Sequence, residues 1–370
     1  MDTVTAVIMS GPAGPSALEQ AVAAARRAAA LDLHATLTRL PQVGRIIIAA
    51  STREREKLSA LGIDSTDWDV DPPDEPFHFG RRLVDIIQRH RLNRVAYFGA
   101  GSAPLLTADQ LEEAMAVVAA SPDRVAVTNN VHSADWVVFS HADAVSSIAG
   151  WLERDNMLAW RLRESAGFSM NSLPASTGTR MDIDTPFDLQ VLALHPRTPL
   201  HMRELLWEMA DGLHLDPVRR AIRVLNTPGS RVTLIGRVSG AAWQKLESQS
   251  GLWTRVLSEE RGMAANRRQA TGQVFSLIAD HIEHIGEAEF VAQLARTSDV
   301  VFFDTRVYLA HHQSWPSASE RFASDLGQWQ MIEDGRLRGL TEAIADAPIP
   351  IIAGGHNVVS GGLWALLEIV

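Results

Sequence analysis

The segment Arg94–Leu111 sets the strongest constraint on the fold of this chain. It opens with an apolar run, Val95–Phe98, and continues through a turn that reads GAGSAP. Thr107 and Gln110 then have the spacing of a capping box, so we expect a helix that begins at Ala108. A strand, a glycine turn and a capped helix in this order place a small-molecule site at the carboxyl end of a sheet strand.

Strand and helix patterns alternate on both sides of this segment. Apolar runs typical of buried strands occupy residues 4–9, 45–50, 125–128 and 136–140. We expect helices after Ser16, which forms a capping-box pattern with Glu19, and over Thr52–Leu61 and Gly80–His90. The acidic, proline-rich stretch Trp68–Pro76 is expected to form a loop. The predicted fold class is α/β, with a mostly parallel, doubly wound sheet.

The pattern restarts after the proline pair in His195–Pro199, and 370 residues favour two domains. We expect a first domain over 1–197 and a second, smaller α/β domain over 198–370. Strands are expected at 231–235, 253–257, 300–303 and 349–353, with helices over 200–213, 217–225 and 273–296.

Composition excludes several classes of protein. The chain has no cysteine, which rules out disulfides, thiolate metal sites and a cysteine nucleophile. A net charge of −10 argues against a nucleic-acid surface. No window approaches the roughly 18–20 apolar residues of a membrane helix, and the N-terminus has no basic leader, so we expect a cytoplasmic protein. Tryptophans in amphipathic contexts, such as Trp151 and Trp207, suggest a homo-oligomer interface or core filling.

Two motifs carry a family resemblance over about residues 1–195. One is the Pro-Leu-Leu-Thr sequence at 104–107, which follows a buried strand, and the other is Met-Asp-Ile-Asp-Thr-Pro-Phe-Asp-Leu at 181–189. Both resemble nucleotidyltransferases of the glycosyltransferase-A type. The nearest likenesses are the molybdenum-cofactor nucleotidyltransferases and the 2-phospholactate guanylyltransferases. The resemblance implies transfer of a nucleoside monophosphate to a phosphorylated acceptor with Mg²⁺.

The resemblance also implies the site residues. Asp182 and Asp184 would be the catalytic metal ligands, and the nucleotide would contact Gly11, Gly14, Gly99, Gly101, Ser102 and Asn130. Ser102 stands where the family has a metal-binding aspartate. Pro12 and Pro15 remove N–H donors from a loop that has no nearby cation. The Asp182–Asp184 pair has a second interpretation, a strand end followed by a helix with Thr185 as N-cap.

The second half predicts a separate site. Charged and glycine residues follow its strands, where parallel sheets bind ligands, so they could surround an anionic metabolite or form structural ion pairs. These residues are Arg237, Glu260, Arg261, Asp304, Arg306, His356, Asn357 and Ser360. His311 and His312, expected on a strand, would point to opposite faces and share no ion. Three functions therefore stay open: a nucleotidyltransferase, an inactive nucleotide- or anion-binding protein, and an enzyme with its active site in the second half.

Overall fold

The computed structural model describes residues 3–63, 67–72, 76–249 and 251–369. Contacts between residues divide the chain into two compact units. Unit 1 consists of Met1–Ala13, Ala23–Asp182 and Pro199–Met202, and unit 2 consists of Gly14–Val22, Ile183–Thr198 and Arg203–Val370. The domain boundary expected at residue 197 stays a prediction.

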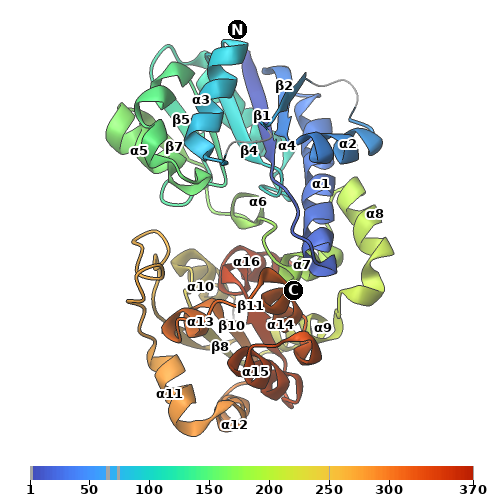
Figure 1. The fold of residues 1–370 in the computed structure, drawn as a ribbon. Coiled ribbons are helices and arrows are strands. Elements are labelled where there is room, and N and C mark those ends of the chain that lie inside the picture. The colour runs from blue at the N-terminus through green and yellow to red at the C-terminus, as the bar shows by residue number, and fades with distance from the viewer. Residues whose placement is uncertain (1–2, 64–66, 73–75, 250, 370) are drawn as a thin grey trace. The chain divides into compact units, whose positions relative to one another are not determined.

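Unit 1 is built on a seven-stranded sheet with the order β3-β2-β1-β4-β6-β5-β7 (Figure 1). The strands are β1 (Val4–Ser10), β2 (Val43–Ala50), β3 (Asp67–Val70), β4 (Val95–Gly99), β5 (Val125–Thr128), β6 (Trp136–Phe139) and β7 (Ser169–Ser172). Strand β6 is antiparallel to both neighbours, and every other described pair is parallel. The predicted α/β class with a mostly parallel sheet is confirmed.

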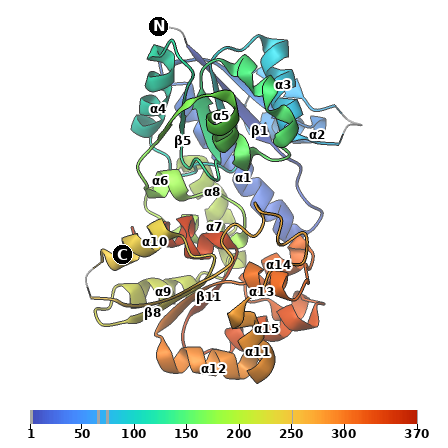
Figure 2. The ribbon, with the colours of Figure 1, turned by 90° about the vertical axis from the view of Figure 1, so that its left-hand side faces the viewer.

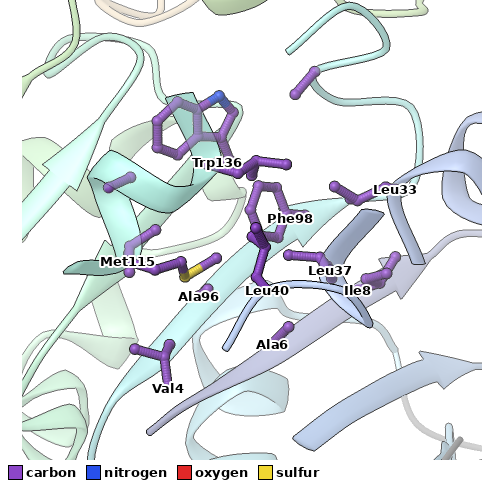
Figure 3. Close-up of a cluster of buried hydrophobic side chains, with 14 of the residues drawn as sticks. Val4, Ala6, Ile8, Leu33, Leu37, Leu40, Ala96, Phe98, Met115 and Trp136 are labelled. Atoms are coloured by element: carbon purple, nitrogen blue, oxygen red, sulfur yellow. The ribbon is translucent and has the colours of Figure 1, made fainter. Parts of the chain in front are cut away.

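Helices cover both faces of this sheet. The helices are α1 (Ala17–Leu37), α2 (Thr52–Ala60), α3 (Phe79–His90), α4 (Ala108–Ala120), α5 (Leu158–Ala166) and α6 (Thr177–Arg180). One core joins Ile8 and Phe98 of the sheet to Leu37 of α1 and Met115 of α4 (Figure 3). The other face forms a second core with α3 and with α5, which packs on β5 and β7 (Figure 2). Alternate residues of each strand therefore serve opposite cores.

Local signals in the sequence predicted most helix starts. Thr107 and Gln110 form the expected capping box at α4, and Ser16 and Glu19 exchange hydrogen bonds just before α1. The loop expected over Trp68–Pro76 was wrong in its first part, because β3 pairs in parallel with β2 there. Residues 73–75 of that expected loop lie outside the described residues.

Unit 2 is built on a four-stranded sheet with the order β11-β10-β8-β9, and all its strands are parallel. The strands are β8 (Arg231–Gly236), β9 (Trp253–Ser258), β10 (Val300–Asp304) and β11 (Ile351–Gly354). The helices are α7 (Pro186–Leu194), α9 (Asp216–Leu225), α10 (Gly240–Glu247), α11 (Leu277–Ile285), α12 (Glu287–Thr297), α13 (Arg306–His311), α14 (Ala318–Asp325), α15 (Gly335–Ala345) and α16 (Gly361–Leu366); α8 (Leu200–Glu208) begins in unit 1.

The core of unit 2 lies largely on one face of its sheet. Ile235, Val301 and Phe303 pack there against α11, α12 and α15, whereas α9 contacts β10 and β11 outside that cluster. The single helix expected over 273–296 is two helices, because Gly286 has a φ of 83° and ends α11. Among the described residues, no helix is both long and apolar enough to cross a membrane.

Candidate functional site

The carboxyl ends of β1 and β4 form the candidate nucleotide site of unit 1. The two strands are parallel, Met9 is in register with Gly99, and the N–H of Ala100 donates to the carbonyl of Met9 at 2.9 Å. The strand order runs in one direction from β1 through β2 to β3 and in the other from β4. This change of direction is the topological switch point, where open parallel sheets bind ligands.

Ser102 and Asp182 meet at this switch point. They form an isolated antiparallel bridge, so the two motifs of the family resemblance are neighbours in space. The hydroxyl of Ser102 donates to the carbonyl of Gly99 at 2.7 Å, which fixes the turn. The next residue, Ala103, has a φ of 56° and precedes Pro104, a combination that strains the backbone. The strand end expected at the Asp182–Asp184 pair was wrong, because only this isolated bridge forms there.

The predicted glycines have different surroundings. A Cβ on Gly11 would meet no atom within 4 Å, so space is open beside this backbone. A Cβ on Gly99 would make only ordinary contacts. Gly14 belongs to unit 2, where a Cβ would collide with the carboxylate of Glu19 at 1.9 Å. This carboxylate is the flexible end of the Glu19 side chain, so the packing does not require a glycine, and a nucleotide contact at Gly14 stays a prediction.

Asn130 closes the loop after β5. Its side-chain oxygen accepts the N–H of His132 at 3.1 Å, and its own N–H donates to Thr128. The preceding Asn129 exchanges hydrogen bonds with Asp135. The amide oxygen of Asn130 thus has an internal partner, and a nucleotide contact stays a prediction.

Sequence reasoning missed several polar groups of unit 1. The hydroxyl of Tyr97 donates to Asp155 at 2.7 Å, and burial and this carboxylate raise the pKa of Tyr97 well above its usual value. Arg180 lies just before the Asp182 motif in the sequence. Its Nε is buried and has no hydrogen-bond partner among the described residues, and burial lowers its pKa despite the charge of Asp135. Its position next to that motif is the feature of the sequence that could have identified it as a site residue.

In unit 2, two of the predicted arginines are held by buried aspartates. Arg237 contacts Asp304 through Nε at 2.6 Å and Nη2 at 3.1 Å. Burial alone would raise the pKa of Asp304, but Arg237 outweighs it and holds that pKa below its usual range. The guanidinium of Arg306 binds Asp325 at 2.7 Å instead. Ion pairing accounts for both guanidinium groups, and the backbone N–H of Arg306 also donates to the carboxylate of Asp304 at 3.2 Å.

The other predicted residues of unit 2 have internal partners. Glu260 forms an ion pair with Arg268 at 2.7 Å. The hydroxyl of Ser360 donates to the carbonyl of His356 at 2.9 Å and contacts Asn357. Two glycines follow Ser360 and begin helix α16. Helix α16 has only six residues, and a Cβ on its second residue, Gly362, would lie 2.5 Å from the ring of Phe187, which gives that glycine a packing role.

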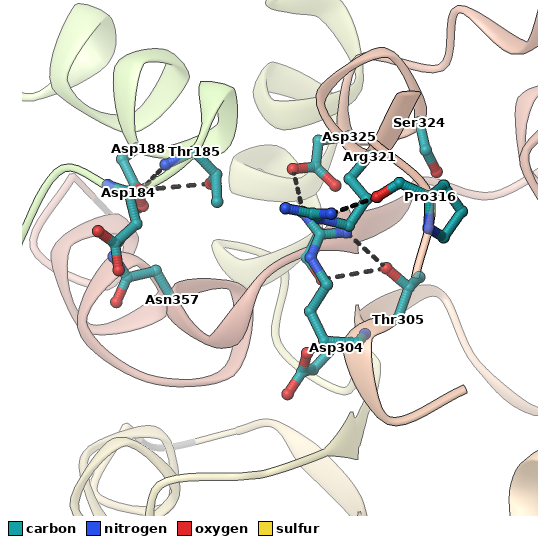
Figure 4. A network of polar contacts seen from close by, with 12 residues as sticks. Asp184, Thr185, Asp188, Asp304, Thr305, Pro316, Arg321, Ser324, Asp325 and Asn357 are labelled. Atoms are coloured by element: carbon teal, nitrogen blue, oxygen red, sulfur yellow. Dashed lines mark hydrogen bonds and ion pairs between the residues drawn. The ribbon is translucent and has the colours of Figure 1, made fainter. Parts of the chain in front are cut away.

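Asp188 gathers a polar network at the start of α7. It accepts the N–H groups of Asp184 at 2.8 Å and Thr185 at 2.7 Å, the hydroxyl of Thr185 at 3.2 Å, and the side-chain amide of Asn357 at 2.9 Å (Figure 4). Burial raises the pKa of Asp188 to about 7; the Asp184 carboxylate adds to this and the hydrogen bonds oppose it. The expected helix cap is confirmed. A metal-ligand role for Asp184 stays a prediction.

His356 and Arg261 complete the strand ends of unit 2. His356 keeps an exposed surface, yet crowding around its ring and the charge of Arg237 lower its pKa below the usual range. The charge of Arg261 lowers the pKa of His356 as well.

His311 and His312 do not lie on a strand, so that expectation was wrong. They lie at the end of α13, and their ring centroids are 4.9 Å apart. A carboxylate oxygen of Glu283 and one ring nitrogen of each histidine lie within 4.8 Å of one another. The N–H of Ser276 donates to Nδ1 of His311, which leaves the ring proton on Nε2. Metal ligands normally have the opposite arrangement, with the second ring nitrogen donating. The cluster therefore carries no metal assignment.

Two cavities of unit 2 lie away from these strand ends. One, of about 450 Å³, is lined by the beginnings of β8 and β9. The other, of about 570 Å³, lies between α9, α14 and β11. Arg237, Asp304 and His356 line neither of them.

Neither protein family models nor curated protein sequences match this chain. Solved structures are similar over part of it. A candidate nucleotide-diphospho-sugar transferase from Desulfovibrio desulfuricans G20 is 18% identical, covers 58% of this chain and 97% of its own, and has a TM-score of 0.43. A cytidylyltransferase from Leptospira borgpetersenii serovar Hardjo-bovis is 9% identical, covers 58% and 96%, and has a TM-score of 0.40. CMP:2-keto-3-deoxy-manno-octonic acid synthetase complexed with CTP is 11% identical, covers 57% and 100%, and has a TM-score of 0.37.

Proposed function

We propose that unit 1 binds a nucleoside triphosphate at the carboxyl ends of β1 and β4 and transfers its nucleoside monophosphate to a phosphorylated acceptor. The bridge between Ser102 and Asp182 carries this proposal, because it joins the two resembling motifs at the switch point. The resemblance to molybdenum-cofactor nucleotidyltransferases and 2-phospholactate guanylyltransferases supplies the reaction class.

Mg²⁺ fits the donor set of this site. The hydroxyl proton of Ser102 is committed to Gly99, which leaves oxygen lone pairs beside the segment that carries Asp182. Mg²⁺ in nucleotide sites usually keeps several waters and takes one or two carboxylates together with the substrate phosphates. Asp182 and Ser102 would hold the ion, and the ion would neutralise charge on the phosphate oxygens.

The chain's own residues have two tasks in this reaction. An oxygen of the acceptor phosphate forms a bond to the α-phosphorus while the bond from that phosphorus to the bridging oxygen breaks, and pyrophosphate leaves. Arg180 supplies a cation to the phosphates, with its buried Nε still able to donate. The open space beside Gly11 allows the phosphates to approach the backbone closely.

Thermal unfolding tests the binding step. We expect one of CTP, GTP, ATP and UTP to raise the melting temperature of the full chain only with Mg²⁺. Asp182→Asn should abolish this shift, and Ser102→Asp, which restores the family's carboxylate, should increase it. Asp143→Asn is the matched control, since Asp143 is exposed in the same unit. A shift that survives Asp182→Asn, or no shift with any nucleotide, overturns the proposal.

Pyrophosphate release tests the chemistry separately. We expect release only when the stabilising nucleotide, Mg²⁺ and a phosphorylated acceptor are all present. Nucleotide binding without release from any acceptor tried would favour the second candidate, a nucleotide-binding protein without transfer. Two observations favour that candidate: Ser102 replaces the aspartate, and Pro12 lacks an N–H donor in the first loop.

A further inference from the structure

Unit 2 has a switch point of its own. From β8 the chain passes to β9 on one side of the sheet and then to β10 and β11 on the other. The carboxyl ends of β8 and β10 therefore form the switch point, the place at which parallel sheets bind ligands. Both strands belong to unit 2.

The carboxyl ends of β8 and β10 approach each other closely at this switch point. Gly236 ends β8 with a φ of 108°, and a Cβ there would lie 2.7 Å from the Cβ of Asp304. Only glycine allows this approach, which brings the Arg237 backbone and side chain onto the Asp304 carboxylate. The positive charge of Arg237 is therefore neutralised by Asp304 and is not available to a ligand.

Arg261 is the uncommitted cation of the predicted site. Arg237 and Arg306 are each paired with an aspartate, whereas Arg261 has no hydrogen bond or ion pair within the described part of the chain. Its Nη1 lies 4.0 Å from the Cβ position of Gly240, the first residue of α10. An exposed arginine next to a helix start can bind an oxyanion with two parallel hydrogen bonds. The turn over residues 356–359, which begins at His356, contacts the same two strands, β8 and β10.

We propose that the carboxyl ends of β8 and β10 form a second ligand site, which binds a small metabolite through a phosphate or carboxylate group. Arg261 is the charge partner of that group, and His356 is a polar contact beside it. The neutral pair of Arg237 and Asp304 holds the strand ends in place beneath them.

Line broadening in NMR spectra tests this site on the full chain. Inorganic phosphate is followed by its ³¹P signal, and ¹³C-labelled acetate by its ¹³C signal, at constant ionic strength. We expect at least one of the two to broaden with the wild-type protein, and Arg261→Ala to weaken its binding about tenfold or more. His356→Gln should weaken it less.

Two controls separate this site from other anion binding. Arg223→Ala removes an exposed arginine from α9 of the same unit and should leave binding unchanged. Saturation with the stabilising nucleotide should leave it unchanged as well, because the nucleotide occupies the proposed site of unit 1. Equal weakening by Arg223→Ala, loss of binding under saturating nucleotide, or no broadening by either anion overturns the proposal. The nucleotide proposal rests on Asp182→Asn and is not affected by these outcomes.

Discussion

At the scale of single residues, Asp188 links protonation to stability. Its pKa of about 7 lies above that of an unfolded aspartate, so the folded chain binds the extra proton between about pH 4 and pH 7. Stability should therefore fall as pH rises through this range, by up to about 1.4 kcal/mol per pH unit. Urea unfolding at pH 5, 6, 7 and 8 measures this slope. Asp188→Asn should flatten it, whereas Asp346→Asn, at an exposed position, should not.

The ion pair between Arg306 and Asp325 predicts a second effect at this scale. Both side chains are buried, and burial raises the pKa of Asp325 despite the neighbouring guanidinium. Arg306→Met leaves that carboxylate unpaired, which we expect to cost about 3–5 kcal/mol at pH 8. The loss should be smaller at pH 5, where the acid can take up a proton. Urea unfolding should also show that adding Asp325→Leu recovers most of the loss; a double variant as unstable as the single one would contradict this account.

At the scale of residues, the sequence predicts which side chains lie at strand ends but not which partners they bind. The sequence predicted that Arg237 and Asp304 lie at strand ends, because strands are visible as apolar runs, and Arg237 does follow β8 while Asp304 is the last residue of β10. That Arg261 shares a site with them stays a prediction. The sequence could not assign side-chain partners. Arg306 lies two residues after Asp304 but turns to Asp325, and that choice depends on how α14 packs.

At the scale of elements, the capping box of α4 predicts a local loss of stability. Thr107 is exposed, so its side chain contributes through the bonds at the helix start and not through packing. Thr107→Ala should cost about 1 kcal/mol in urea unfolding, because the N–H of Gln110 loses its acceptor, the hydroxyl of Thr107. Thr107→Ser keeps the hydroxyl and is the matched control. An equal loss in both variants would mean that the methyl group, and not the cap, matters.

Element prediction succeeded where the signal is local and failed where it is tertiary. Capping boxes and buried apolar runs depend on neighbouring residues, so α4 and the strands β4 and β10 were predicted correctly. Strand β3 reads Asp-Trp-Asp-Val; it alternates polar and apolar residues over only four positions, and its buried residue is the polar Asp69. It is a strand because β2 offers an edge and because Arg82, Arg89 and His90 contact the carboxylate of Asp69. None of these partners can be inferred from the four residues themselves.

At the scale of the whole molecule, two sheets each have a switch point, and each is proposed to bind a different ligand. The sequence predicted two α/β halves, because strand and helix patterns restart after residue 199. It did not predict that Gly14–Val22 and Ile183–Thr198 would belong by contacts to unit 2, since contacts between distant segments leave no periodicity. A homo-oligomer stays a prediction, although Trp151 and Trp207 are exposed as such an interface would need.

Hydrogen exchange can separate the two proposed sites in one experiment on the full chain. A ligand that binds the folded state slows local opening of the backbone it contacts. The stabilising nucleotide with Mg²⁺ should protect residues 9–13, 99–104 and 180–182 of unit 1, and the oxyanion should protect 237–241, 259–261 and 355–357 of unit 2. Asp182→Asn should remove the first pattern alone, and Arg261→Ala the second alone. If one ligand protects both sets, the two switch points do not act as independent sites, because independent binding requires that each pattern respond to its own ligand.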